Sequence, residues 1–145
     1  MRKETISKAM LYFAKFSLAT AFLSAVADRF GLWGNMGDLG ISWGTMENFY
    51  VHVAKLCPWA PNFLVPILGW LVNIVELLLG IALLCGIKPK FTALSTTILL
   101  FVFAASMAAF QSVKLMLNFS VLTCAACAIF VYFSSDCKFE EKSDR

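Results

Sequence analysis

The class of fold is decided by residues 63–86, FLVPILGWLVNIVELLLGIALLCG, which contain a single charged side chain, Glu76. Two further stretches, Phe91–Val113 and Leu115–Ser135, contain no charged residue. A helix needs about 20 mainly apolar residues to cross the hydrocarbon core of a bilayer. The chain is 60% hydrophobic with a mean hydropathy of +0.78, which is more apolar material than one soluble domain of 145 residues can bury. The sequence therefore predicts an integral membrane protein.

We expect an all-α fold, a polytopic bundle of four transmembrane helices that forms a single domain over residues 1–145. The predicted spans are about 9–27, 63–86, 91–110 and 118–135. The alternating ten-residue segments of an outer-membrane barrel are absent, and helices then remain the way to satisfy the backbone in lipid. The lipid bilayer is thus the first predicted partner. The four spans and the outer loop leave too few residues for a separate soluble catalytic domain.

The distribution of Lys and Arg predicts the orientation. Eight of them lie in the two tails and in the connection between the second and third spans: Arg2, Lys3, Lys8, Lys88, Lys90, Lys138, Lys142 and Arg145. The two opposite connections hold three: Arg29, Lys55 and Lys114. We therefore expect both termini on the cytoplasmic side of the cell (inner) membrane, as an even number of spans requires.

The longest connection, residues 30–62, faces outward in this topology. Its first part is rich in glycine and is expected to be irregular. Its second part predicts a short amphipathic helix over about 46–56, because Thr45 suits the N-cap and apolar residues follow at helical spacing. These apolar residues are Met46, Phe49, Tyr50, Val53 and Leu56. Such a helix lies along the outer membrane surface or covers the bundle.

Glu76 is the first candidate for a functional residue, because it lies near the middle of the second predicted span. A carboxylate at that depth costs about 2.5–3.5 kcal/mol to insert, so it should face protein or water. Gly69, Asn73, Glu76 and Gly80 recur at helical spacing and form a small and polar stripe that should face the bundle interior. Glu76 would then accept a proton or contact a polar ligand. Alternatively, its hydrogen bonds lock the bundle.

Lys15 is a second charge within a predicted span. We assign the inward side of the first span to its small and polar residues, Ser17, Ala21, Ser24 and Asp28. Lys15 lies nearly opposite this side, although its depth would permit an ion pair with Glu76. Two alternatives follow: Lys15 pairs with Glu76, or it extends to the cytoplasmic headgroups.

Asp28 and Arg29 end the first predicted span at the outer surface. Asp28 would continue the inward side and join Glu47 or His52 in a polar mouth above the bundle. The alternative is a solvated helix end with a local charge pair, which contributes little. Trp70, in the second span, would either stack on a quinone or pack in the core.

Other chemistry has weak support in the sequence. Cys124 and Cys127 have the Cys-x-x-Cys spacing of redox motifs, but Cβ atoms at i and i+3 of a helix are about 5–6 Å apart, too far for a disulfide. A packing role is therefore predicted. No metal site is expected, because His52 is the single histidine and has no cluster of ligands around it. Nucleic-acid binding is excluded by the lack of a basic face.

Residues 22–34, FLSAVADRFGLWG, close the first predicted span in a distinctive way. With other positions of the loop and second span, they resemble the DoxX-like family of small four-helix membrane proteins. The other matching positions are Trp43, Glu47-Asn48-Phe49, Gly69-Trp70, Glu76–Gly80 and Leu84-Cys85-Gly86. The resemblance covers most of the chain. Glu76 matches the acidic residue of the family's second span, and Lys15 stands where relatives often have an arginine.

Some members of that family are linked to thiosulfate:quinone oxidoreductases, and others to membrane complexes that manage oxidative or thiol stress. The resemblance therefore implies an accessory or quinone-interacting subunit of a membrane redox system. Its candidate ligand contacts are Asn73, Glu76, Trp70, Asp28 and Arg29, and Glu76 is the candidate catalytic residue. Two alternatives are a non-catalytic scaffold that recruits a protein partner through Phe30–Asn62, and a small-solute carrier, which lacks the expected inverted repeat.

Overall fold

The computed structural model describes the backbone of residues 2–143 and the side chains of residues 7–135. Its helices are α1 (Arg2–Arg29), α2 (Met46–Leu56), α3 (Leu64–Cys85), α4 (Pro89–Phe110), α5 (Val113–Asn118) and α6 (Val121–Ser143). No strand occurs within residues 2–143. Several side chains used to predict the orientation lie outside the described residues: Arg2, Lys3, Lys138, Lys142 and Arg145.

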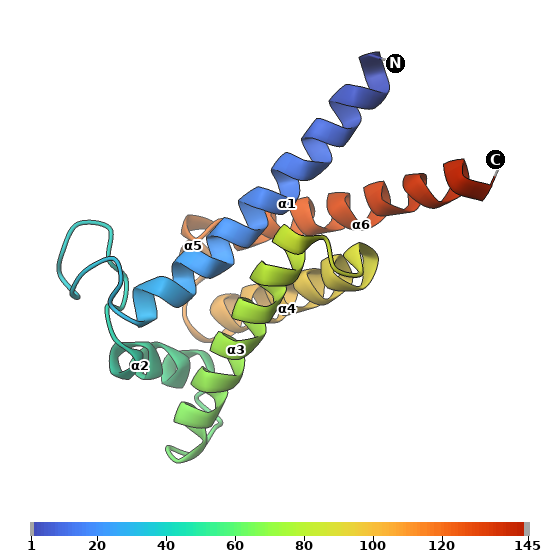
Figure 1. The fold of residues 1–145 in the computed structure, drawn as a ribbon. Helices are drawn as coiled ribbons and strands as arrows, with labels where there is room; N and C mark the ends of the chain where they lie inside the picture. Colours follow the sequence, from blue (N-terminus) through green and yellow to red (C-terminus); the bar gives the residue numbers. More distant parts are fainter. Residues whose placement is uncertain (1, 144–145) are drawn as a thin grey trace.

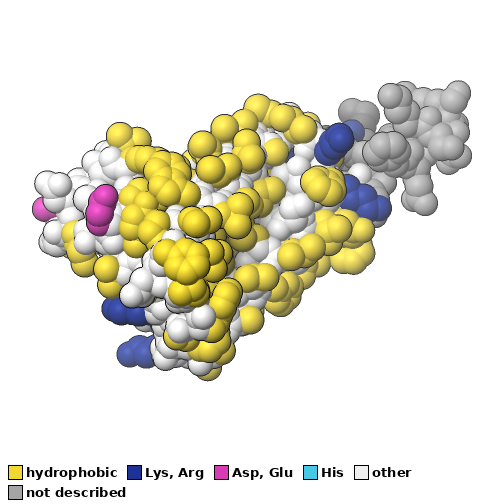
Figure 2. Space-filling view, turned by 90° about the horizontal axis from the view of Figure 1, so that it is seen from below, with side chains coloured by type: hydrophobic (Ala, Val, Ile, Leu, Met, Phe, Trp, Pro, Cys, Tyr) yellow, Lys and Arg dark blue, Asp and Glu magenta, His cyan; other side chains and the backbone are white. Residues whose placement is uncertain are grey.

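Among the described residues, three helices are long and apolar enough to cross a membrane: Ser7–Arg29 within α1, Leu64–Cys85 and Pro89–Phe110. In α6, the shorter stretch Val121–Ser135 is apolar. Between 28% and 39% of the residues in the three spanning windows are buried, so most side chains of these helices point outward. Figure 2 shows how hydrophobic side chains cover much of the visible face. An outer surface of this kind suits lipid and not water, which confirms the prediction of an all-α membrane protein.

The long helices α1, α3, α4 and α6 form a ring in which each packs against two others. α1 contacts α3 and α6, and α4 also contacts α3 and α6. The two chain ends and the α3–α4 turn lie at one end of the bundle, whereas α2 and the segment before it lie at the other (Figure 1). At the α3–α4 turn, Gly86 caps α3 with a left-handed φ of 67°, and Pro89 begins α4.

The inward side of α1 differs from the sequence-based assignment. Leu18 and Phe22 are buried, whereas Ala21 and Ser24 are exposed. The reason lies in the partner helix, because a Cβ atom at Gly80 of α3 would lie 2.9 Å from the Cγ of Leu23. The close approach of these two helices therefore depends on Gly80 of α3, against which α1 places Leu23 and the backbone of Ala19.

α2 covers the end of the bundle opposite the chain ends. Thr45 is its N-cap, and the Asn48 amide donates to the Thr45 hydroxyl at 3.3 Å. Phe49 and Val53 are buried against the start of α3. The ring of Tyr50 lies on Gly69, where a Cβ atom would come within 2.9 Å of the ring. Gly69 thus lets α2 lie directly on α3 and close this end of the bundle.

Candidate functional site

The polar stripe on α3 faces the interior as predicted, since Gly69, Asn73, Glu76 and Gly80 are all buried. The two glycines serve helix packing. Asn73 and Glu76, which are 2% and 3% exposed, place an amide and a carboxyl group inside the bundle. Buried polar groups of this kind need partners, so the question is which residue supplies them.

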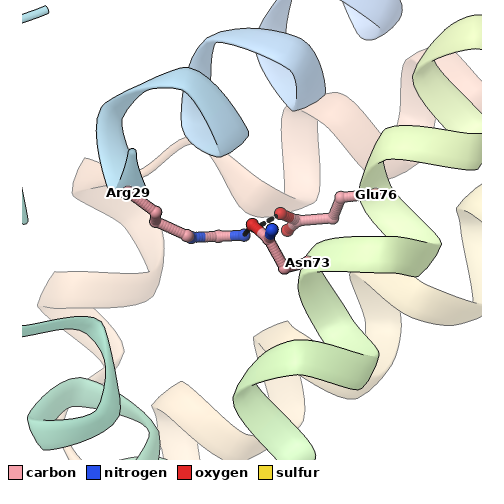
Figure 3. A network of polar contacts seen from close by, with 3 residues as sticks. All are labelled: Arg29, Asn73 and Glu76. Atoms are coloured by element: carbon pink, nitrogen blue, oxygen red, sulfur yellow. Dashed lines mark hydrogen bonds and ion pairs between the residues drawn. The ribbon is translucent and has the colours of Figure 1, made fainter. Parts of the chain in front are cut away.

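Arg29, the last residue of α1, is that partner. Its Nη1 donates to Asn73 Oδ1 at 3.1 Å and forms an ion pair with Glu76 Oε2 (Figure 3). Within the described part of the chain, the cation in contact with Glu76 is thus Arg29. Lys15 is also buried, but it lines a different cavity beside the α3–α4 turn. The alternative prediction, that the end of α1 is solvated, is wrong, because Asp28 and Arg29 are 7% and 3% exposed.

Aromatic rings hold the guanidinium of Arg29 from the other side. Its Cζ lies 3.8 Å from the ring centroid of Phe49 and 5.0 Å from that of Trp43. A desolvated cation–π contact contributes about 2 kcal/mol. The Nε of Arg29 is buried and has no hydrogen-bond partner among the described residues. One donor of a rigidly held guanidinium is therefore left without a partner among the described residues.

Asp28 anchors the loop that carries Trp43. Its carboxylate accepts hydrogen bonds from the backbone amides of Ser42 and Trp43, both at 3.1 Å, and of Gly44 at 3.3 Å. Gly44 has a φ of 68°, and a Cβ atom there would lie 2.7 Å from the Met36 nitrogen, so the tight loop needs glycine. The predicted polar mouth is wrong in its partners, because Asp28 binds backbone amides and not Glu47 or His52.

A cavity of about 410 Å³ lies beside the Arg29–Glu76 pair, between α1, α2, α3, α4 and α6. Its volume falls within the range of about 300–1,000 Å³ that is typical of small-ligand sites. The wall is mainly apolar and includes a few polar side chains, those of Arg29, His52, Glu76 and Ser106. Asn73 is outside the lining and acts on the cavity through Arg29. The arrangement suits a mostly apolar ligand with one polar end.

Trp70 is not part of this site. It is 45% exposed and contacts Phe30 on the outer surface, with ring centroids 6.0 Å apart. The prediction that Trp70 packs in the core is therefore wrong, and stacking of Trp70 on a quinone stays a prediction that would apply outside this cavity. At 100° per residue, Trp70 lies about 90° around the helix from the centre of the stripe that contains Glu76, which turns its ring away from the interior.

His52 lines the cavity, whereas the sequence suggested it only as a partner of Asp28 in a polar mouth. Its ring lies 5.7 Å from that of Trp43 and 6.4 Å from that of Phe49, centroid to centroid. Burial lowers the pKa of His52 below its ordinary value of 6.5, and the charges of Arg29 and Lys55 lower it further. The imidazole is thus neutral at pH 7, with one donor and one acceptor nitrogen. The available signal was its position three residues after Phe49, on the same face of α2.

The cysteines divide between the cavity and the helix contacts. Cys57 and Cys124 line the cavity, and burial raises the pKa of the Cys57 thiol, which keeps it protonated at neutral pH. Cys124 and Cys127 are free thiols. The Cys127 thiol donates to the Ala14 carbonyl at 3.7 Å, so it packs on α1. This arrangement is compatible with the packing role that we predict for the pair.

Among the side chains that the structure describes, no group of three or more His, Cys, Asp or Glu residues could hold a metal ion. Comparisons of the chain with protein-family models, curated proteins and solved structures find no match. The arrangement that remains is a neutral imidazole and a paired guanidinium in the wall of an apolar cavity. Such a site can bind and orient a ligand by one or two hydrogen bonds and by aromatic contact.

Proposed function

We propose that this protein binds a lipid-soluble quinone between its helices, as a DoxX-like accessory subunit of a redox system in the inner membrane. The observation that carries the proposal is the unpartnered Nε of Arg29, buried in the wall of a mainly apolar cavity. A buried donor without a partner costs about 1–3 kcal/mol. A ligand that supplies an acceptor oxygen recovers this energy, which favours its binding at that point.

The charge balance of the site favours a neutral ligand. The guanidinium of Arg29 is always charged and already has Glu76 opposite it. Because His52 is neutral, an anionic ligand would have to compete with Glu76. A quinone carbonyl is a neutral acceptor on a flat apolar ring. Trp43 and His52 offer aromatic faces for that ring in the same wall.

Quinone binding can be measured by tryptophan fluorescence, because Trp43 and Trp59 line the cavity. A decyl-substituted benzoquinone added to the protein in nanodiscs is expected to quench this fluorescence with saturation. Arg29→Lys keeps a cation near Glu76 but lacks the Nε–H donor. One hydrogen bond to a charged group contributes about 1.5–3 kcal/mol, so the affinity should fall about tenfold or more.

The matched control is Trp70→Phe, which removes an aromatic side chain outside the cavity and should leave the affinity unchanged. A decyl carboxylate should compete poorly with the quinone, because its charge repeats that of Glu76. Quenching without saturation, or equal affinities of the native protein and Arg29→Lys, would contradict the proposal.

The orientation is also a proposal: four spans with α6 as the fourth, and both termini in the cytoplasm. The described basic residues Lys8, Lys88 and Lys90 lie towards the end of the bundle where the chain starts and stops (Figure 1). Lys55 and Lys114 belong to α2 and α5, at the other end. With Arg29, the second end has three described basic residues as well, so the excess that supports a cytoplasmic first end comes from Arg2, Lys3, Lys138, Lys142 and Arg145 of the sequence.

Single-cysteine variants test this orientation. Ala54→Cys, at an exposed position of α2, should react with a membrane-impermeant maleimide in intact cells. The native Cys85, which is exposed beside the α3–α4 turn, should react after the membrane is opened. Each cysteine is tested with the other cysteines replaced by serine. Labelling of Cys85 in intact cells would show that the orientation is reversed.

A second function is favoured by the loop that Asp28 anchors. Leu32, Met36 and Leu39 of this loop are between 63% and 104% exposed. Exposed apolar side chains that are held in place mark contact surfaces for proteins or membranes. We propose that the loop also recruits a protein partner of the redox system. Replacing Leu32 and Leu39 by serine should then abolish co-purification of that partner and leave quinone affinity unchanged.

A further inference from the structure

The lining of the cavity beside Arg29 includes an exposed residue on α1, Ala21, on the side of this helix that faces α6. On the side of α1 that faces α6, Ala14 is 7% exposed and its carbonyl contacts the Cys127 thiol. Ala21 follows two turns later on the same side, yet it is exposed and lines the cavity. The two helices cross at an angle (Figure 1), so they touch at Ala14 and separate towards Ala21.

Small side chains of the lining belong to this side: Ala21 and Ala25 of α1 and Cys124 of α6. Other exposed residues of the lining are larger, since Val102 is 55%, Trp59 66% and Phe119 43% exposed. The opening at Ala21 is therefore bordered by smaller side chains than the other exposed parts of the cavity.

We propose that the ligand beside Arg29 carries an apolar chain that leaves the cavity at Ala21 and continues into the bilayer. The proposal rests on the quinone function and specifies the ligand further: a neutral carbonyl-bearing ring with a long alkyl or isoprenoid chain. A chain in lipid gains no hydrophobic energy from entering the protein. A passage through which the chain stays in lipid therefore lets the ring reach Arg29 without moving the chain into the protein.

Two probes with the same benzoquinone ring, one with a decyl chain and one without a chain, separate ring binding from chain passage. In nanodiscs, Ala21→Trp should weaken binding of the decyl quinone at least about tenfold. It should leave binding of the chainless quinone unchanged, because Ala21 is at the rim and Arg29 is at the inner end.

A matched tryptophan substitution serves as the control. Ala126→Trp adds the same bulk at an exposed position of α6 that is outside the cavity lining, and it should leave the affinity for both probes unchanged. Val102→Trp tests the alternative that the chain leaves the cavity at α4. Equal losses for both probes in Ala21→Trp, or selective loss of the decyl quinone in Val102→Trp, would overturn the proposal.

The opening can also be measured without any quinone. With the other cysteines replaced, a lipid-soluble maleimide should label Cys124 from the bilayer, and Ala21→Trp should slow this labelling severalfold. If neither quinone binds but Ala21→Trp still slows the labelling, the opening is supported and the quinone assignment fails. Labelling that is equally fast with and without Ala21→Trp would overturn the opening itself.

Discussion

Glu76→Leu is expected to destabilise the folded protein by about 3–5 kcal/mol, because it leaves the buried charge of Arg29 without its counter-ion. Both side chains of the pair are nearly inaccessible, at 3% and 4% exposure, so water cannot compensate for the loss. Glu76→Gln should cost less, because its amide oxygen can still accept from the Nη1 of Arg29. The free energy of unfolding, measured by denaturation with SDS in mixed micelles, gives this order directly.

Two further variants identify the cause. Glu47→Leu makes the same chemical change at an exposed carboxylate of α2 and should cost less than about 1 kcal/mol. The double variant Arg29→Leu with Glu76→Leu removes both charges and should be more stable than Glu76→Leu alone. If the double variant is less stable than Glu76→Leu alone, the unpaired charge of Arg29 is not the cause of the destabilisation by Glu76→Leu.

The second large effect is expected at Asp28, where Asp28→Ala removes the acceptor of three backbone hydrogen bonds. The amide of Gly44 is then buried and unsatisfied, and that of Trp43 is partly so. At about 1–3 kcal/mol for each unsatisfied group, the folded state should lose about 2–4 kcal/mol. The loop should also release Trp43, which thermal unfolding and the emission wavelength of tryptophan can measure together.

Asp38→Ala is the matched control, because Asp38 lies in the same loop and accepts a hydrogen bond from the Asn35 amide at 2.9 Å on the exposed surface. Water can replace that bond, so the expected loss is less than about 1 kcal/mol. Equal losses for Asp28→Ala and Asp38→Ala would show that the three amides do not depend on Asp28.

Features of the fold that depend on residues close together in the sequence could be predicted from the sequence. The apolar runs identify the long helices, Thr45 marks the start of α2, and the spacing of Phe49 and Val53 marks its buried side. The inward side of α3 also follows from helical phase, because a buried glutamate leaves few alternatives. The prediction of which α1 residues face inward is wrong, because the glycine that allows close packing, Gly80, lies on α3 and not on α1.

The candidate site depends on contacts between distant segments, and here the sequence was less informative. The sequence places Arg29 with Asp28 at the outer end of the first span and predicts it as a ligand contact only through the family resemblance, although Leu18, Phe22, Ala25 and Arg29 share one helical face. That spacing places Arg29 with the buried leucine and phenylalanine. The contact with Glu76 further requires that α1 and α3 cross at a particular depth. Helical phase within one segment does not contain that information.

Asp28 and Arg29 are joined by one peptide bond, so a single turn of backbone holds both the loop outside the bundle and the charge within it. A ligand that displaces Arg29 must therefore strain the anchor of the Ser42, Trp43 and Gly44 amides. Hydrogen exchange of these amides therefore measures whether a ligand in the cavity shifts Arg29 or leaves it in place.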